Sequence, residues 1–117
     1  MTEAEPRTVN IGASPIARGL RVALLSTGLV ALAGIGVRGD YILRTDIAAF
    51  ESGEAISMSG GENAQIIASE TVAIGDLAYS AANGTASKTS AGAVLLGRWT
   101  QAATVGVPGE VELFSVA

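Results

Sequence analysis

Two pairs of glutamates come closest to a catalytic or metal-binding arrangement in this sequence. Glu51 lies near Glu54, and Glu110 lies near Glu112. Such pairs can bind a divalent cation or act as general acid and base. Strand alternation would place Glu110 and Glu112 on one face, opposite the intervening apolar residues. We therefore interpret both pairs as solvent-facing charges and expect neither a metal nor another cofactor.

The other residue types that carry most catalytic chemistry are missing or isolated. The chain contains no His and no Cys, and Lys88 is its single lysine. Without His, a Ser or Thr nucleophile would need a Ser–Lys arrangement built on Lys88. That lysine lies in a polar stretch where a solvated side chain is the simpler role. We expect that the protein is not an enzyme.

Two tripeptides match known recognition signals. Arg38-Gly39-Asp40 is an integrin-binding sequence, and Asn83-Gly84-Thr85 fits the N-glycosylation acceptor pattern. Both are also ordinary turn sequences, because Gly and Asn tolerate the positive φ that tight turns require. We interpret them as turns.

Composition narrows the class of protein. The chain has 117 residues, of which 49% are hydrophobic but only 4% aromatic, and 15 are Gly. This composition predicts one domain of strands and tight turns. The net charge is −4 and the arginines are scattered. Nucleic acid is therefore not an expected partner, because binding it needs clustered cations.

One uncharged run, "VALLSTGLVALAGIGV" at 22–37, invites interpretation as a membrane span. It is shorter than the roughly 20 residues that a bilayer requires. It is also bounded by Arg21 and Arg38 and interrupted by three glycines. We expect no membrane association.

Short apolar segments separated by turn residues indicate an all-β fold, either a small β-barrel or a β-sandwich. No stretch keeps a helical period. Gly-containing turns predict hairpins from 20–25 with 29–33, 54–58 with 64–68, and 76–80 with 85–89. Pro108-Gly109 fits the middle of a type II turn. The remaining expected strands are 41–45, 93–99 and 110–116.

Residues 1–15 form a polar segment that contains Pro6 and Pro15. We predict an extended N-terminal arm, with the β domain occupying 16–117. Val9 and Ile11 are the apolar residues in 1–15 spaced as in a strand, and they suit pairing with a neighbouring subunit.

The chain also contains an internal echo. "GLRVALLSTGLVAL" is similar to "GDLAYSAANGTASK", and "ESGEAISM" is similar to "VPGEVELF". In both cases the two similar segments are separated by about 55 residues, if a difference of one residue is allowed. The echo predicts two related β units that form a pseudo-symmetric pair.

The second half contains an apolar strand ending in "GDLAY" (75–79), a turn and Thr/Ser-rich strand (83–89), "LLGRW" (95–99) and "GEVEL" (109–113). In this order of motifs it resembles the small capsid decoration, or cement, proteins of tailed bacteriophages. The resemblance covers about 45 residues well and the first half loosely. Trp99 departs from the family pattern, which usually has a small residue there.

This resemblance implies a compact β-barrel or β-sandwich that forms homo-oligomers, with a trimer favoured and a dimer possible. It implies a virion protein on the outer surface of the assembled head. There it would bind major capsid proteins at their junctions and stabilise the shell. The alternative is a carbohydrate- or receptor-binding β-module on a virion surface. The residues expected to contact the capsid or a neighbour are Arg7, Val9, Ile11, Trp99 and Phe114.

Overall fold

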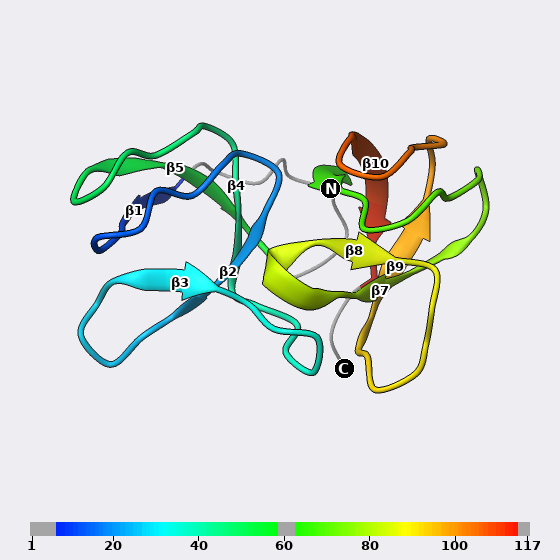
Figure 1. Cartoon of the computed structure of the whole chain (residues 1–117), viewed down its shortest axis with the longest axis horizontal. Helices are drawn as coiled ribbons and strands as arrows, with labels where there is room; N and C mark the ends of the chain where they lie inside the picture. Colours follow the sequence, from blue (N-terminus) through cyan, green and yellow to red (C-terminus); the bar gives the residue numbers. More distant parts are fainter. Residues whose placement is uncertain (1–6, 59–62, 115–117) are drawn as a thin grey trace.

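The computed structural model describes residues 7–58 and 63–114, which form two five-stranded antiparallel sheets side by side (Figure 1). The all-β prediction is confirmed. The first sheet has the order β1-β5-β4-β2-β3 and the second has the order β6-β10-β9-β7-β8. A short 3-10 helix, η1 (Ala82–Gly84), joins β7 to β8. The strands are β1 (Arg7–Asn10), β2 (Arg21–Leu24), β3 (Val30–Leu32), β4 (Tyr41–Leu43), β5 (Ser52–Ser57), β6 (Asn63–Ile67), β7 (Leu77–Ser80), β8 (Ala86–Ser87), β9 (Leu95–Trp99) and β10 (Pro108–Leu113).

The two sheets are structural repeats, as the internal echo predicted. Strands β1 to β5 and β6 to β10 occur in the same spatial order. The bridge between Ile16 and Ile47 has its counterpart between Val72 and Ala103, an offset of 56 residues. We call residues 7–58 the first repeat and 63–114 the second.

Each sheet curls until its two edges touch at one point. A parallel bridge between Ile11 and Val30 joins the edges of the first sheet, and one between Ala68 and Ala86 joins those of the second. Curling lets a single sheet bury its own inner face. The first repeat therefore has its own core cluster: Val9, Ile11, Ile16, Val22, Val30, Leu43, Ile47 and Ala55.

The second core is larger, and it also takes side chains from the first repeat. Ile42 and Ile56 lie opposite each other in β4 and β5, and both belong to the core cluster of the second repeat. Trp99 is fully buried there, and its indole N–H donates to the carbonyl of Ser87 at 3.1 Å. The outer face of the first sheet is thus covered by the second repeat.

The predicted N-terminal arm is wrong for residues 7–15. Residues 7–10 form β1, which pairs with β5, and Val9 and Ile11 are buried in the first core. The alternation of apolar residues correctly indicated a strand. Its partner lies in the same chain rather than in a neighbour, which a local pattern cannot specify. Residues 1–6 lie outside the described residues.

Two of the three predicted hairpins are confirmed. Strand β2 pairs with β3, and β7 pairs with β8. The third is wrong, because β5 pairs with β1 and β4 whereas β6 pairs with β10. The predicted turn at Pro108-Gly109 is also wrong, since both residues begin β10. The proline occupies the first strand position, where its missing N–H is tolerated.

The run at 22–37 forms β2, β3 and the loop that follows. Within 7–58 and 63–114, no helix is long and apolar enough to cross a membrane.

Candidate interaction surface

Three of the five predicted contact residues are wrong. Val9, Ile11 and Trp99 are at most 5% exposed and pack within the cores, so they cannot reach a partner. Arg7 is exposed on β1, and Phe114 is half-buried just after β10. The structure places these two in different repeats, and their contact role stays a prediction.

The Arg-Gly-Asp tripeptide is built into the fold. The guanidinium of Arg38 donates to the carbonyls of Met58, Leu95 and Phe114. Burial lowers the pKa of Arg38. The carboxylate of Asp40 accepts from the Leu24 N–H at 2.7 Å. Since both charged side chains are engaged internally, the tripeptide has a structural role, but the hydrogen-bonded turn lies just before it, at residues 34–37, and not at the predicted 38–40.

Arg21 joins the two repeats and is the most buried charged residue of the described chain. Its guanidinium donates to Thr85 and Ala81 in the second repeat at 2.9 and 2.7 Å. It also donates to three carbonyls of the first repeat, those of Gly34, Val37 and Arg38. Burial lowers the pKa of Arg21 to about 10. All five guanidinium N–H groups are used, which satisfies a charge that has left water.

The remaining candidate chemistry also has structural roles. Glu110 accepts from the hydroxyl of Thr100 at 2.8 Å. Asn83 has φ = 57° and Gly84 has φ = 77°, which confirms the interpretation of that tripeptide as turn geometry. Across the described ranges, no cluster of three potential metal ligands is found.

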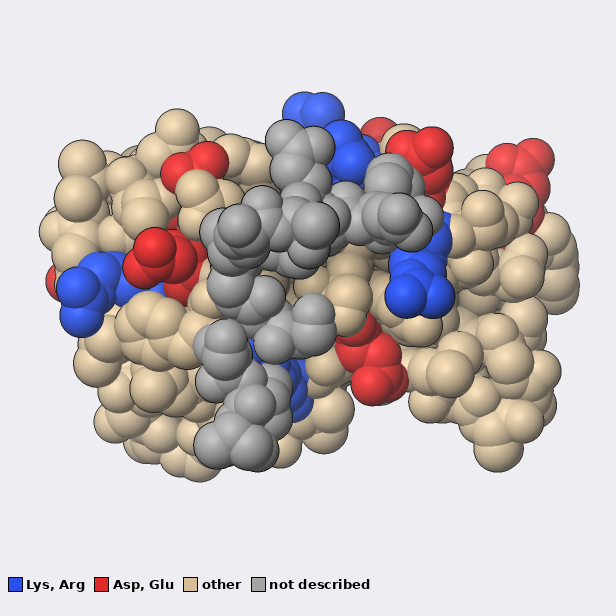
Figure 2. Space-filling model, turned by 180° about the vertical axis from the view of Figure 1, so that it is seen from behind, with Lys and Arg blue, Asp and Glu red and all other residues tan. Residues whose placement is uncertain are grey.

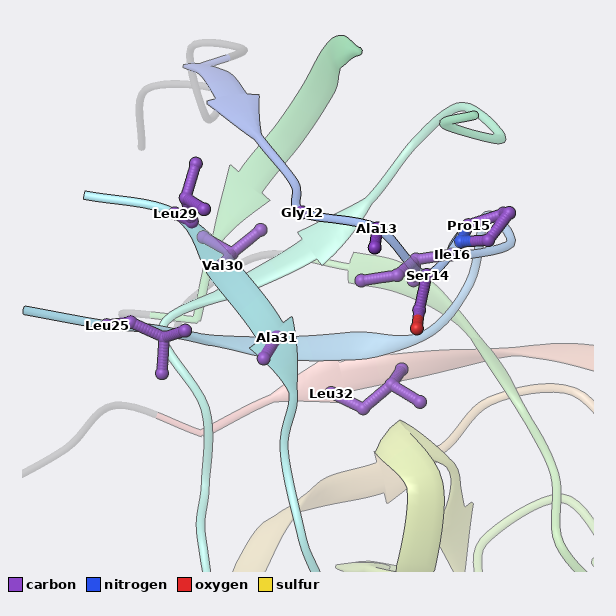
Figure 3. A pocket seen from close by; sticks show the side chains of 10 residues that line it. All are labelled: Gly12, Ala13, Ser14, Pro15, Ile16, Leu25, Leu29, Val30, Ala31 and Leu32. Carbon is purple, nitrogen blue, oxygen red and sulfur yellow. The ribbon is translucent and has the colours of Figure 1, made fainter. Parts of the chain in front are cut away.

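An apolar groove lies beside the edge strand β3. It has a volume of about 450 Å³ and is lined by residues 12–16, Leu25 and residues 29–32. Figure 3 shows residues 12–16 diverging from β3 beyond Val30, with the leucine side chains projecting from the β2–β3 hairpin. We call this the β3 groove.

None of the residues that line the β3 groove is charged, and three leucines in or beside it are exposed. Leu24, Leu25 and Leu32 are 53%, 46% and 42% exposed. Figure 2 shows charges of both signs scattered over the back of the molecule. Its lower right lobe, on the side of the β2–β3 hairpin, carries none. Sequence reasoning missed this site, although the uncharged run at 22–37 was its signal.

The equivalent place in the second repeat is closed. Ser69 donates through its N–H to the carbonyl of Ala86 in β8 at 2.8 Å. The carboxylate of Glu70 accepts from the Lys88 N–H and from the Thr89 hydroxyl, at 3.3 and 2.6 Å. The bent segment at Ser69 and Glu70 thus bonds to β8 and to the residues after it, where the first repeat has the groove.

Comparison with known proteins finds similarity to solved structures but not to family models or curated sequences. No family model matches the chain, and no curated protein matches it. Among solved structures, it is similar to the N-terminal base of the head fibre protein gp8.5 of bacteriophage phi29, with a TM-score of 0.76 and 17% identity. The fold resembles a head-fibre base. The match covers 93% of this chain and 92% of the other, so both repeats are shared.

Proposed function

We propose that this chain is a structural protein of a tailed-bacteriophage virion that attaches to the outer surface of the head. The observation that carries the proposal is the shared fold with the base of a phage head fibre, over nearly the whole of both chains. Fold alone does not determine function, so the proposal also needs support from the residues.

The residues support attachment rather than catalysis. The chain has neither His nor Cys. Arg21, Arg38 and Glu110 are engaged in structural hydrogen bonds. Exposed leucines around an uncharged groove suit burial against another protein. The acidic net charge of −4 suits a position outside the shell, away from DNA.

The finer proposal is a cement role. The chain would bind major capsid proteins at their junctions, as a homotrimer or a dimer, and stabilise the head against internal pressure. Contacts repeated over a lattice act together, so each can be weak. The resemblance of residues 72–113 to decoration proteins supports this role.

The test uses heads of the cognate phage that lack this protein. The purified chain should co-sediment with expanded heads to saturation and raise the temperature at which they release DNA. Bovine serum albumin at equal concentration is the control. Absence of binding would overturn head attachment, whereas binding without a higher release temperature would overturn only the cement role.

The alternative of a carbohydrate- or receptor-binding module on a virion surface has no specific support. Such sites usually display exposed aromatic rings. Trp99 is buried, and Phe50 is the one exposed aromatic residue of the described chain.

A further inference from the structure

The Asn83-Gly84 turn of the second repeat lies against the first repeat and combines two features that bear on chemical modification. The side chain of Asn83 is exposed and makes no hydrogen bond within the described residues. Gly84 is buried, and its N–H donates to the Ala33 carbonyl of the first repeat at 2.8 Å. From this arrangement we propose that Asn83 is a deamidation site, that the contact between the repeats holds the reaction back, and that the reaction proceeds when the repeats separate.

The sequence supplies both reacting groups. The backbone nitrogen of Gly84 attacks Cγ of Asn83, the bond from Cγ to Nδ2 breaks, and Nδ2 leaves as ammonia with the proton of the Gly84 N–H. Water then opens the cyclic imide at either carbonyl, which gives aspartate or isoaspartate at position 83 without an oxidant or a cofactor. Glycine favours this attack because it has no side chain to hinder its nitrogen. The other two asparagines precede Ile11 and Ala64, whose side chains slow the attack.

The contact between the repeats keeps the nucleophile from reacting. Rotating the Gly84 nitrogen onto the asparagine side chain takes its N–H away from the Ala33 carbonyl. The flanking peptides are held as well, since the Arg21 guanidinium donates to the carbonyls of Thr85 and Ala81 at 2.9 and 2.7 Å. Gly84 also has little free space, because a Cβ there would lie 2.6 Å from the Arg21 carbonyl oxygen. The reaction therefore requires an opening in which η1 leaves the first repeat, and its rate follows the population of that open state.

The isoaspartate product prevents the repeats from closing again. In isoaspartate the main chain runs through the side-chain carbon, so a methylene group is added just before Gly84. The close approach of Gly84 to the Arg21 backbone leaves no space for this longer chain. The Gly84 N–H and the carbonyls beside it therefore cannot all return to their partners. The aspartate product keeps the original backbone and an exposed side chain, so it leaves the contact intact.

The first repeat provides a matched turn that lies free of the contact. Gly28 is the counterpart of Gly84, and it is exposed, with nothing within 4 Å of a Cβ built there. Its N–H donates within its own turn, to the Leu25 carbonyl at 3.0 Å. Thr27 precedes it. The substitution Thr27→Asn therefore introduces an Asn-Gly pair at the equivalent turn, without the contact between the repeats.

The test incubates the whole chain at mildly alkaline pH and follows each asparagine by peptide mapping with mass spectrometry. In Thr27→Asn, the introduced asparagine should deamidate at least about tenfold faster than Asn83 of the same molecule. Asn83 should also react at least about tenfold faster in urea than in the folded chain. Arg21→Met loosens the contact and should accelerate the reaction while Trp99 fluorescence stays native. Leu77→Met, at the equivalent position of the second repeat, should leave the rate unchanged.

Hydrogen exchange tests the effect of the product. The purified isoaspartate form should exchange the Gly84 amide at least about tenfold faster than the unmodified chain, whereas Asn83→Asp should keep that amide protected. Equal deamidation rates in urea and in the folded chain would overturn the inference, as would an unchanged rate in Arg21→Met. So would an introduced asparagine that reacts no faster than Asn83, or an isoaspartate form whose Gly84 amide stays protected. None of these outcomes depends on attachment to a phage head.

Discussion

The first and second repeats share strand order, edge bridges and a buried inner face, yet their outer faces differ. Ile42 and Ile56 lie on the outer face of the first sheet and pack into the second core. Their counterparts, Arg98 and Glu112, lie opposite each other across β9 and β10 and are exposed. The same sheet architecture therefore occurs in two environments. Apolar side chains on the outer face of the first sheet let the second repeat cover it, whereas charged side chains leave the outer face of the second sheet exposed to solvent.

The largest effect is expected from giving the first repeat the outer face of the second. The double change Ile42→Arg and Ile56→Glu would bury two charges between the repeats and should cost about 5 kcal/mol or more. Urea denaturation followed by Trp99 fluorescence measures this loss. The reverse change, Arg98→Ile with Glu112→Ile, should leave stability within about 1 kcal/mol and promote association. A small loss in the first variant would mean that the repeats do not depend on each other.

A substitution of Arg21 tests the polar part of the contact between the two repeats. Arg21→Met keeps most of the apolar stem but leaves five carbonyls without their donor, so unfolding free energy should fall by about 3–5 kcal/mol. Its counterpart Leu77 is 38% exposed. Leu77→Met should change stability by less than about 0.5 kcal/mol. Equal losses of unfolding free energy in the two variants would show that the hydrogen bonds of Arg21 do not stabilise the contact between the repeats.

Substitutions at two equivalent glycines can distinguish the cost of a strained backbone conformation from the cost of a steric clash. Both Gly28 and Gly84 have positive φ, at 87° and 77°. A Cβ on Gly84 would lie 2.6 Å from the Arg21 carbonyl oxygen, whereas one on Gly28 would meet nothing within 4 Å. Gly28→Ala should cost about 1 kcal/mol for conformation alone. Gly84→Ala should cost about 2–4 kcal/mol in a thermal melt, because the repeats must also move apart. Equal costs would show that conformation accounts for both.

The smallest effect is expected at the closed groove of the second repeat. Glu70→Gln weakens the acceptor of the Lys88 N–H and the Thr89 hydroxyl, and should cost about 1 kcal/mol. Hydrogen exchange should quicken at the Lys88 amide in particular. Glu51→Gln is the control, because Glu51 is exposed and its side chain makes no hydrogen bond within the described residues. An unchanged Lys88 amide would mean that Glu70 does not close the groove.

Much of the fold could be predicted because its signals are local. Strand segments follow from apolar alternation, and the tight hairpin at Asn83-Gly84 follows from residues that tolerate positive φ. The repeat was visible because both halves keep glycines at equivalent turns. The candidate site could not be predicted in this way, since the groove depends on where residues 12–16 lie relative to β3.

The sequence by itself determined an all-β chain of two related halves with little catalytic chemistry, because composition and short-range patterns are sufficient for these conclusions. Only the tertiary structure decided which strands pair. It placed Val9 and Ile11 in the chain's own core and engaged the charged side chains of Arg38 and Asp40 in hydrogen bonds to distant backbone groups. It also left β3 with an open edge while β8 is covered. The physical reason is that strand pairing and burial join residues far apart in the chain, and a local pattern specifies a strand but not its partner.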